Sequence, residues 1–200
     1  MAFSPETAQP LNELAEVLLR APNSLSTSDR ELIATYVSSQ NDCDFCQRAH
    51  NAVAAYRLEG NENLVDEVKP DFQSALISDK LKALLAVAGN VKKGGKSVTS
   101  ERIEKARQQG ATDKEIHDTV LITAASCMYN RYVDGLATWA PTDPEIYRRN
   151  AKLLAEREEG TENFNWLQEQ IAVRELLDVL NAFAQLLDVR FDLQCQSHDR

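Results

Sequence analysis

Apolar residues recur every three or four positions through most of this chain, and polar breaks separate the stretches. This period is typical of amphipathic helices, whereas no segment shows the strict apolar–polar alternation of a half-buried strand. Helices are expected over residues 11–20, 28–37, 43–56, 78–93, 99–110, 116–128 and 145–159, with 130–140 as a helix or a kinked extension. The pattern predicts an all-α protein, in which the apolar run 116–128 forms the central buried helix.

Local end signals support several of these helices. Ser28 followed by Glu31, and Thr112 followed by Glu115, fit the capping-box spacing at a helix start. Pro144 suits the first turn of the helix that follows it, because proline is tolerated there.

The last 40 residues carry a different pattern. Trp166, Val173, Leu180 and Leu187 are spaced by seven, and Leu177, Ala184 and Phe191 form a second row. Such a stripe predicts a helix of roughly 30 residues whose apolar face must pack on something. We therefore expect a helical core over 1–159 and a C-terminal helical extension over 160–200 that joins subunits of a homo-oligomer; the alternative is that this helix packs on its own core.

Composition and charge narrow the functions. The chain has 200 residues, 43% of them hydrophobic, with a formal net charge of −9. A phosphate backbone would be repelled, so nucleic acid is not an expected partner. No basic run or long apolar stretch suggests a membrane, and the N-terminus has no apolar signal region. A cytoplasmic location is expected.

Cys43, Cys46 and His50 form the motif with the clearest chemistry. A thiol reacts as its thiolate, which a helix N-terminus and a nearby imidazole both favour. On a helix beginning at Cys43, Cys46 lies one turn later and His50 one turn beyond that. The two sulfurs could then meet in a disulfide, and the imidazole could accept a thiol proton directly or through a water.

Glu31, twelve residues before Cys43, is a candidate third member of this site. Its carboxylate could orient the imidazole, but it is equally explained as the capping-box partner of Ser28. Of the other cysteines, Cys127 in an apolar run is expected to be an inert core thiol, and Cys195 in the polar tail to be incidental.

Three other interpretations of the cysteine pair stay open. The pair and His50 could be structural zinc ligands, although the sequence has no second CxxC to complete a site. A thioredoxin-type site would need βαβ units, which the pattern does not predict. Both cysteines could also be small core residues.

The stretch from Glu31 to His50 resembles the core motif of alkylhydroperoxidase D and the carboxymuconolactone decarboxylase superfamily. The family pattern is a glutamate, then CxxC, then a histidine four residues on; Glu31, Cys43, Cys46 and His50 match it. The run 129–136 resembles the peroxidase-related subgroup, and the resemblance covers about residues 10–159. It implies an all-α, alkylhydroperoxidase D-like bundle that assembles as a homo-oligomer.

The resemblance also implies a thiol peroxidase that reduces hydrogen peroxide or organic hydroperoxides and needs no cofactor or metal. Cys46 would attack the peroxide, Cys43 would resolve the sulfenic acid, His50 would relay the proton and Glu31 would orient His50. A thiol or dithiol donor, such as a lipoyl protein or a peroxiredoxin, would restore the dithiol. Alkylhydroperoxidase D has a second histidine just before the second cysteine, where this chain has Phe45, so that assisting group is absent and a more apolar pocket is expected.

Two other functions remain as alternatives. The same residues could serve a protein-disulfide reductase that hands electrons to a peroxiredoxin. A different class is an oligomeric interaction protein that senses redox state or binds zinc, in which the C-terminal stripe carries the function.

Overall fold

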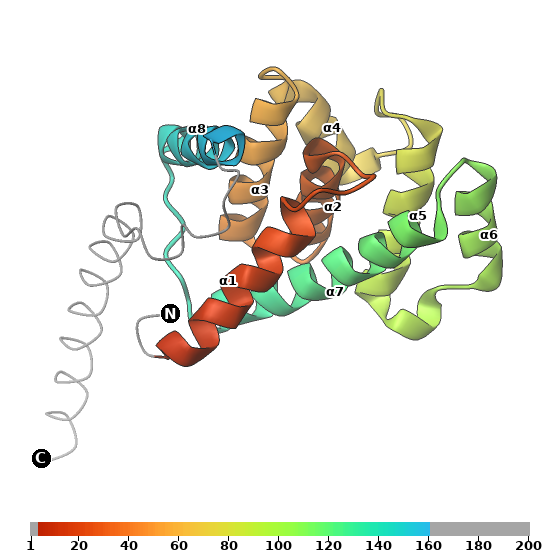
Figure 1. Ribbon diagram of the computed structural model, residues 1–200, viewed down its shortest axis with the longest axis horizontal. Coiled ribbons are helices and arrows are strands. Elements are labelled where there is room, and N and C mark those ends of the chain that lie inside the picture. The colour runs from red at the N-terminus through yellow and green to blue at the C-terminus, as the bar shows by residue number, and fades with distance from the viewer. Residues whose placement is uncertain (1–3, 161–200) are drawn as a thin grey trace, which may run out of the picture. The chain divides into compact units, whose positions relative to one another are not determined.

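The computed structural model describes residues 4–160, and residues 13–160 make up one compact unit. Within the described range the chain is all helical, which confirms the expected fold class (Figure 1). The elements are α1 Pro5–Leu19, α2 Thr27–Gln40, α3 Asp44–Arg57, α4 Glu62–Asp71, α5 Asp79–Lys93, a short 3-10 turn Gly95–Ser97, α6 Ser100–Gln108, α7 Asp113–Gly135 and α8 Pro144–Gly160.

Helix α2 lies at the centre of the unit and packs against α3, α4, α5 and α7. Its Leu32, Ile33 and Val37 are almost fully buried. The expectation that residues 116–128 form the central helix is therefore wrong. Helix α7 buries one side against α2 and α5 but leaves Leu121 and Met128 well exposed on the other.

Several helix ends differ from those expected. The N-cap of α2 is Ser26, whose Oγ accepts a hydrogen bond from the Asp29 N–H, so the helix begins before Ser28 and the expected capping box with Glu31 does not form. The second capping box, Thr112 with Glu115, is confirmed at the start of α7.

Two further differences concern whole segments. Helix α1 begins at Pro5 and continues through Pro10, well before the expected start. Helix α4 was not expected; Asn61 caps its start, and it buries only Val65 and Val68 among mostly polar residues. So short an apolar stripe leaves a weak signal in the sequence.

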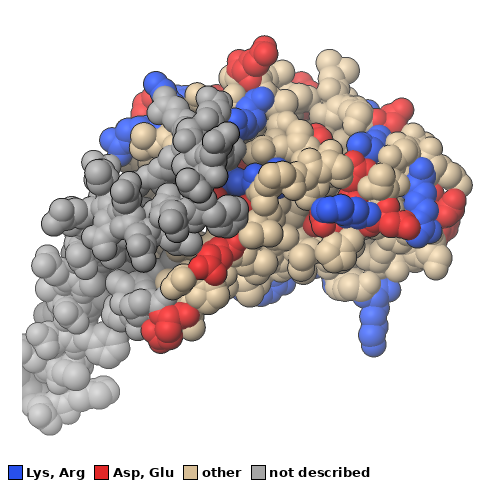
Figure 2. Space-filling view, viewed as in Figure 1, with Lys and Arg blue, Asp and Glu red and all other residues tan. Residues whose placement is uncertain are grey.

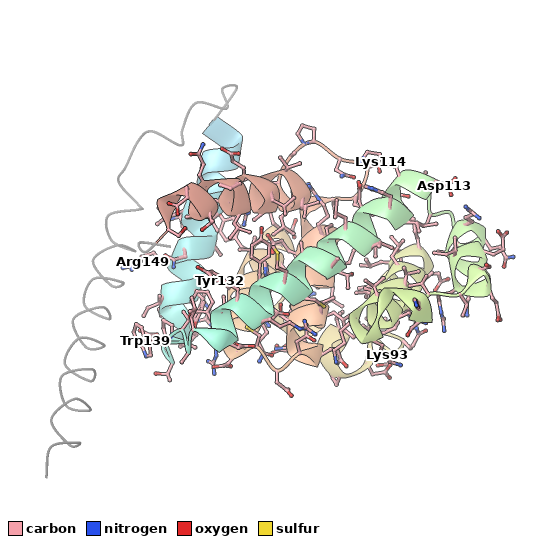
Figure 3. All side chains as sticks on the ribbon, turned by 90° about the horizontal axis from the view of Figure 1, so that it is seen from below. Lys93, Asp113, Lys114, Tyr132, Trp139 and Arg149 are labelled. Atoms are coloured by element: carbon pink, nitrogen blue, oxygen red, sulfur yellow. The ribbon has the colours of Figure 1, made fainter. Side chains whose placement is uncertain are left out.

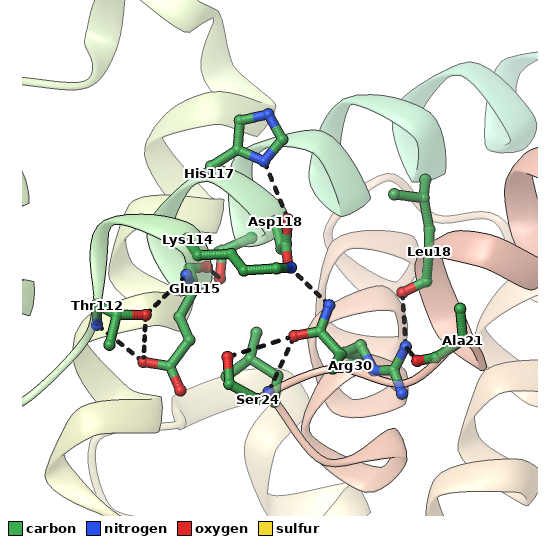
Figure 4. A network of polar contacts seen from close by, with 12 residues as sticks. Leu18, Ala21, Ser24, Arg30, Thr112, Lys114, Glu115, His117 and Asp118 are labelled. Atoms are coloured by element: carbon green, nitrogen blue, oxygen red, sulfur yellow. Dashed lines mark hydrogen bonds and ion pairs between the residues drawn. The ribbon is translucent and has the colours of Figure 1, made fainter.

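Polar side chains tie the loop after α1 to its neighbours (Figure 4). Arg30 of α2 is buried and donates hydrogen bonds to the carbonyls of Leu18 and Ala21, at 3.1 and 3.0 Å. Those carbonyls belong to the end of α1 and the residues after it, where no further turn is available to bond them. The guanidinium therefore fixes where the loop leaves the helix.

A second tie centres on Asp118 of α7. Its carboxylate accepts hydrogen bonds from Asn23 at 2.7 Å and from Lys114, and it pairs with His117 Nδ1 at 2.9 Å. Burial alone would raise the pKa of Asp118, but its three partners outweigh burial and lower it to about 2. The ionised carboxylate of Asp118 therefore stabilises the contact between the α1–α2 loop and α7.

Charged side chains of both signs are interspersed on the face of the molecule seen in Figure 2. No helix within residues 4–160 is both long enough and apolar enough to cross a bilayer. The C-terminal helix expected over 160–200 and its role in assembly fall outside the described residues, so both stay predictions.

Candidate active site

The paired cysteines lie at the start of α3, as expected. Cys43 is the N-cap residue and Cys46 belongs to the first turn. Both thiols are free, and both residues are buried, at 0% and 6% exposure. Each thiol affects the pKa of the other. The helix start therefore holds two reduced cysteines three residues apart, a spacing that allows a disulfide.

Glu31 and His50 meet across the α2–α3 contact. The Oε2 of Glu31 lies 2.7 Å from Nδ1 of His50, while Oε1 lies 3.4 Å from a guanidinium nitrogen of Arg20. The predicted contact is thus confirmed, and the competing capping role of Glu31 is excluded. Sequence reasoning missed Arg20, which stands eleven residues earlier at the end of α1 and gave no motif signal.

The carboxyl of Glu31 is completely buried. Burial by itself would raise its pKa, but the imidazole of His50 and the guanidinium groups of Arg20 and Arg30 outweigh burial, and the pKa of Glu31 lies below its ordinary value. An ionised Glu31 at Nδ1 of His50 favours a proton on that nitrogen and leaves Nε2 as the nitrogen that can exchange a proton.

Polar residues of α7 complete the surroundings of the thiols, and sequence reasoning did not name them. Asn130 is 1% exposed; its Oδ1 accepts from the Asn41 side chain at 2.8 Å, and its Nδ2 donates to Ser38 Oγ at 3.0 Å. Because Asn41 fixes which end of the amide is the oxygen, both amide hydrogens point the other way. The amide of Asn130 also acts to lower the pKa of Cys46.

Asp134 lies one helical turn beyond Asn130, and its carboxylate acts to raise the pKa of Cys43 and of Cys46. Figure 3 shows α7 along its length, from Asp113 and Lys114 in its first turn to Tyr132 near its end. Asn130 and Asp134 are polar, four residues apart and near the end of a largely apolar helix. This spacing was the signal in the sequence that could have indicated their position near the thiols.

The two thiols differ in their electrostatic surroundings. The pKa of both is raised, chiefly by burial, and the pKa of Cys43 is raised further by Cys46 and Asp134. Cys43 and Asn130 act to lower the pKa of Cys46, whereas Asp134 opposes ionisation of either thiol. Cys46 is therefore the sulfur better suited to carry the negative charge, and Cys43 the better suited to keep its proton.

Phe45 stands between the cysteines and packs edge-on against Tyr147 of α8, with ring centroids 6.2 Å apart. The Tyr147 hydroxyl is buried and has no hydrogen-bond partner among the described residues. An apolar wall thus occupies the position where the resemblance would have placed a second histidine.

A surface hollow of about 340 Å³ lies between α3, α4 and α8. Asp44, Arg48 and Asn51 of α3 line it, and they lie on a different face of the helix from Cys46 and His50. Its cations are paired with acids, as Arg48 with Asp44 at 2.8 Å. The hollow does not reach the thiols, so it is not the candidate active site.

No group of three or more His, Cys, Asp and Glu side chains within residues 4–160 is arranged to hold a metal ion. The described chain therefore offers no ligand set for the zinc interpretation. Cys127 is half-buried against the core, and its sulfur accepts a 3.5 Å hydrogen bond from Asn41.

The fold and site define a class of all-helical proteins with two reduced cysteines at a helix start and a buried carboxylate–imidazole pair beside them. A sequence model of the carboxymuconolactone decarboxylase family matches residues 5–68, which contain Glu31, Cys43, Cys46 and His50. This match confirms the resemblance seen in the motif. No protein with a curated description matches the chain.

Solved structures share the fold. A peroxidase-related protein from Silicibacter sp. TM1040 is 25% identical, with a TM-score of 0.67 over 74% of this chain and 75% of that one. A peroxidase-related protein from Ralstonia eutropha JMP134, described as an alkylhydroperoxidase AhpD core, has the same identity and score over 74% and 77%. The debrominase Bmp8 is 18% identical, with a TM-score of 0.63 over 75% and 79%, and is similar in fold alone.

Proposed function

We propose that the protein is a thiol peroxidase that reduces hydrogen peroxide or organic hydroperoxides through a dithiol–disulfide cycle. The observation that carries this proposal is the pair of free, buried cysteines at the start of α3, together with a completely buried Glu31 carboxylate 2.7 Å from the imidazole of His50 on the same helix. A dithiol peroxidase needs two thiols that can close a disulfide and a base that can take a thiol proton.

The reaction has two steps before reduction. The Cys46 thiolate attacks the terminal oxygen of the hydroperoxide; the O–O bond breaks, Cys46 becomes a sulfenic acid, and the alcohol or water leaves with a proton. Cys43 then forms the S–S bond with Cys46 and expels the sulfenic oxygen as water. An external thiol or dithiol returns two electrons and restores both thiols.

His50 and Glu31 serve the first step as a proton relay. No direct hydrogen bond joins His50 to Cys46, both of which the structure describes, so the proton passes through a water between Nε2 and the sulfur. Glu31 holds the imidazole at Nδ1 and stabilises the charge it gains on accepting the proton.

The burial of both cysteines bears on the electron donor. With exposures of 0% and 6%, the disulfide offers little surface to a bulky protein thiol. A dithiol on a narrow arm, such as a lipoyl group, fits this access better than a thiol embedded in a folded domain. We therefore expect dihydrolipoamide to reduce the disulfide faster than a peroxiredoxin or thioredoxin-like protein does.

The test is a peroxidase assay with hydrogen peroxide and an organic hydroperoxide, using dihydrolipoamide and a peroxiredoxin in turn. Wild type should turn over, and Cys46→Ser should abolish consumption of peroxide. Cys43→Ser should consume one equivalent and stop at a sulfenic acid. Cys127→Ser is the matched control and should keep full activity, because this half-buried thiol lies outside the pair. A wild type inert to both peroxides but rapidly oxidised by a disulfide-form peroxiredoxin would refute the proposal in favour of a disulfide reductase.

A further inference from the structure

A second surface hollow, of about 320 Å³, is formed by α2, α5, the end of α4 and the start of α6. Helix α5 packs against both α2 and α6, so it makes the floor of the hollow (Figure 1). The hollow shares no lining residue with the hollow beside α8, and neither the thiols nor the pair of Glu31 and His50 line it. It is therefore a feature separate from the candidate active site.

Three cations line this hollow: Lys92 and Lys93 in the last turn of α5, and Arg102 in the first turn of α6. Among the described residues that line it, none is Asp or Glu, and none of the three cations has an ion pair within residues 4–160. In the hollow beside α8, by contrast, Arg48 and Lys69 each pair with a carboxylate, at 2.8 and 2.7 Å. Positive charge is thus left unbalanced in one concave place on a chain of net charge −9, and such a place attracts anions.

Helix stability explains the two lysines of this hollow but not the arginine. Cations in the last turn of a helix interact favourably with the partial negative charge of that end, and Lys92 and Lys93 stand there. Arg102 stands at the opposite kind of end, since its backbone N–H donates to Oγ1 of the N-cap Thr99 at 3.2 Å. The helix dipole disfavours a cation in this first turn. Binding of an anion in the hollow gives this half-buried arginine a use that the helix does not.

Aromatic rings line the side of the hollow formed by α2 and the end of α4. Tyr36 and Phe72 are both half-buried and pack edge to face, with ring centroids 5.2 Å apart. The Tyr36 hydroxyl lies 2.9 Å from the place where a Cβ of Gly89 would stand, so only glycine lets this ring reach over α5. The hydroxyl has no hydrogen bond to another described residue. Asn90 is bound through its Nδ2 to the Ser97 carbonyl at 2.6 Å, which leaves its Oδ1 as an acceptor in the hollow.

We propose that this hollow binds a free nucleoside phosphate. Lys92, Lys93 and Arg102 would hold the phosphate groups, because each phosphate ester carries about 1.5 to 2 negative charges near neutral pH and an arginine can bond two of its oxygens. The base would lie against Tyr36 and Phe72, since bases stack on aromatic side chains. The volume of about 320 Å³ is at the lower end of the range for small-molecule pockets and suits one small ligand. This binding does not depend on the thiol chemistry proposed above.

Isothermal titration calorimetry of the full chain, with EDTA present, tests the proposal. ADP and UDP are the purine and pyrimidine probes, and adenosine and pyrophosphate are the two halves of ADP. ADP or UDP should bind at one site per chain. Pyrophosphate should bind about tenfold more weakly than the better of the two nucleotides, because it lacks the stacked base. Adenosine should bind more weakly still, because it lacks the charges.

Variants locate the binding. Arg102→Gln should weaken nucleotide binding by about tenfold or more, because it removes a charge-assisted hydrogen bond, and Arg102→Lys should recover part of the loss. Lys96→Gln is the matched control. It removes the same charge from an exposed position in the turn between α5 and α6 that does not line the hollow, and it should leave the affinity unchanged. Far-ultraviolet circular dichroism should give equal helix content in all variants.

Four results decide the proposal. If neither ADP nor UDP binds at millimolar concentration, the site is refuted. Equal affinities for the nucleotides and pyrophosphate would overturn the assignment to a nucleoside phosphate. Equal losses from Arg102→Gln and Lys96→Gln would show diffuse attraction of anions and overturn the site. A wild type that binds nucleotide but is inert to hydroperoxide would support this site while refuting the peroxidase, and Cys46→Ser should bind nucleotide as wild type does.

Discussion

Replacing Glu31 by glutamine should destabilise the fold more than any other single charge removal near the site. The carboxylate is fully buried, lies 2.7 Å from His50 and 3.4 Å from Arg20, and has its negative charge stabilised by both. Glutamine keeps the shape but loses the charge, and its NH2 group faces a donor where an oxygen accepted before. Breaking a buried ion pair costs about 3–5 kcal/mol, and hydrogen bonds to charged groups contribute about 1.5–3 kcal/mol each.

The partners of Glu31 limit this cost. The side chains of His50 and Arg20 are 22% and 12% exposed, and Arg20 keeps a second partner in Glu16 at 3.1 Å. After Glu31 is replaced, water can therefore solvate His50 and Arg20, and Glu16 can still pair with Arg20. We expect a loss of about 3 kcal/mol in the free energy of unfolding, at the low end of the range for buried pairs. With a urea slope of about 2 kcal/mol per molar, the midpoint should fall by about 1.5 M.

Urea denaturation followed by circular dichroism measures this loss, with Glu16→Gln as the matched control. Glu16 pairs with the same arginine but is 27% exposed, so its removal should cost no more than about 0.5 kcal/mol. The pKa of Glu31 is lowered in the fold, so its contribution is present above the unfolded pKa of about 4.3 and is lost as the pH falls through the folded value. The gap between wild type and Glu31→Gln should therefore narrow below pH 4. If Glu31→Gln and Glu16→Gln lower the free energy of unfolding equally at neutral pH, the stabilising role of the buried Glu31 pair is refuted.

Three further predictions concern other residues. His50→Ala should slow alkylation of Cys46 by iodoacetamide near neutral pH by about tenfold or more; an unchanged pH–rate profile would make His50 a packing residue only. Asp118→Asn should lower the free energy of unfolding by about 2 kcal/mol above pH 4, because the pKa of Asp118 falls from 3.8 to about 2 on folding, and this deficit should vanish as the pH approaches 2. Tyr147→Phe should raise the free energy of unfolding by about 1 kcal/mol in urea melts, since it removes a buried hydroxyl that has no partner among the described residues. A decrease of about 1 kcal/mol would instead show that the hydroxyl makes a hydrogen bond.

The sequence predicted the part of the site that one helix determines. Cys43, Cys46 and His50 are related by the helical repeat alone, so their spacing sufficed once a helix start was expected at Cys43. Glu31 was ambiguous because a shift of two residues in the start of α2 decides its role. With the cap at Ser26 rather than Ser28, Glu31 lies inside the helix and turns towards α3.

The residues from α7 could not be predicted in the same way. Asn130 and Asp134 stand more than 80 residues from the thiols, and their approach depends on how α7 crosses the α2–α3 turn. The capping box of Thr112 and Glu115 located the start of that helix but not the direction of its faces. The periodicity of residues 116–128 indicated a buried helix, whereas one side of it is exposed, since apolar residues occur on both faces.

The amide of Asn130 constrains how this protein can change by mutation. Its Oδ1 accepts a hydrogen bond from Asn41 and its Nδ2 donates one to Ser38, in a place with almost no water. An apolar residue there would remove a partner from both of these side chains at once, while loss of either partner strands a single atom of the Asn130 amide. We therefore expect substitutions at these positions to be tolerated only in combination. A redesign of this region should change the interacting residues together.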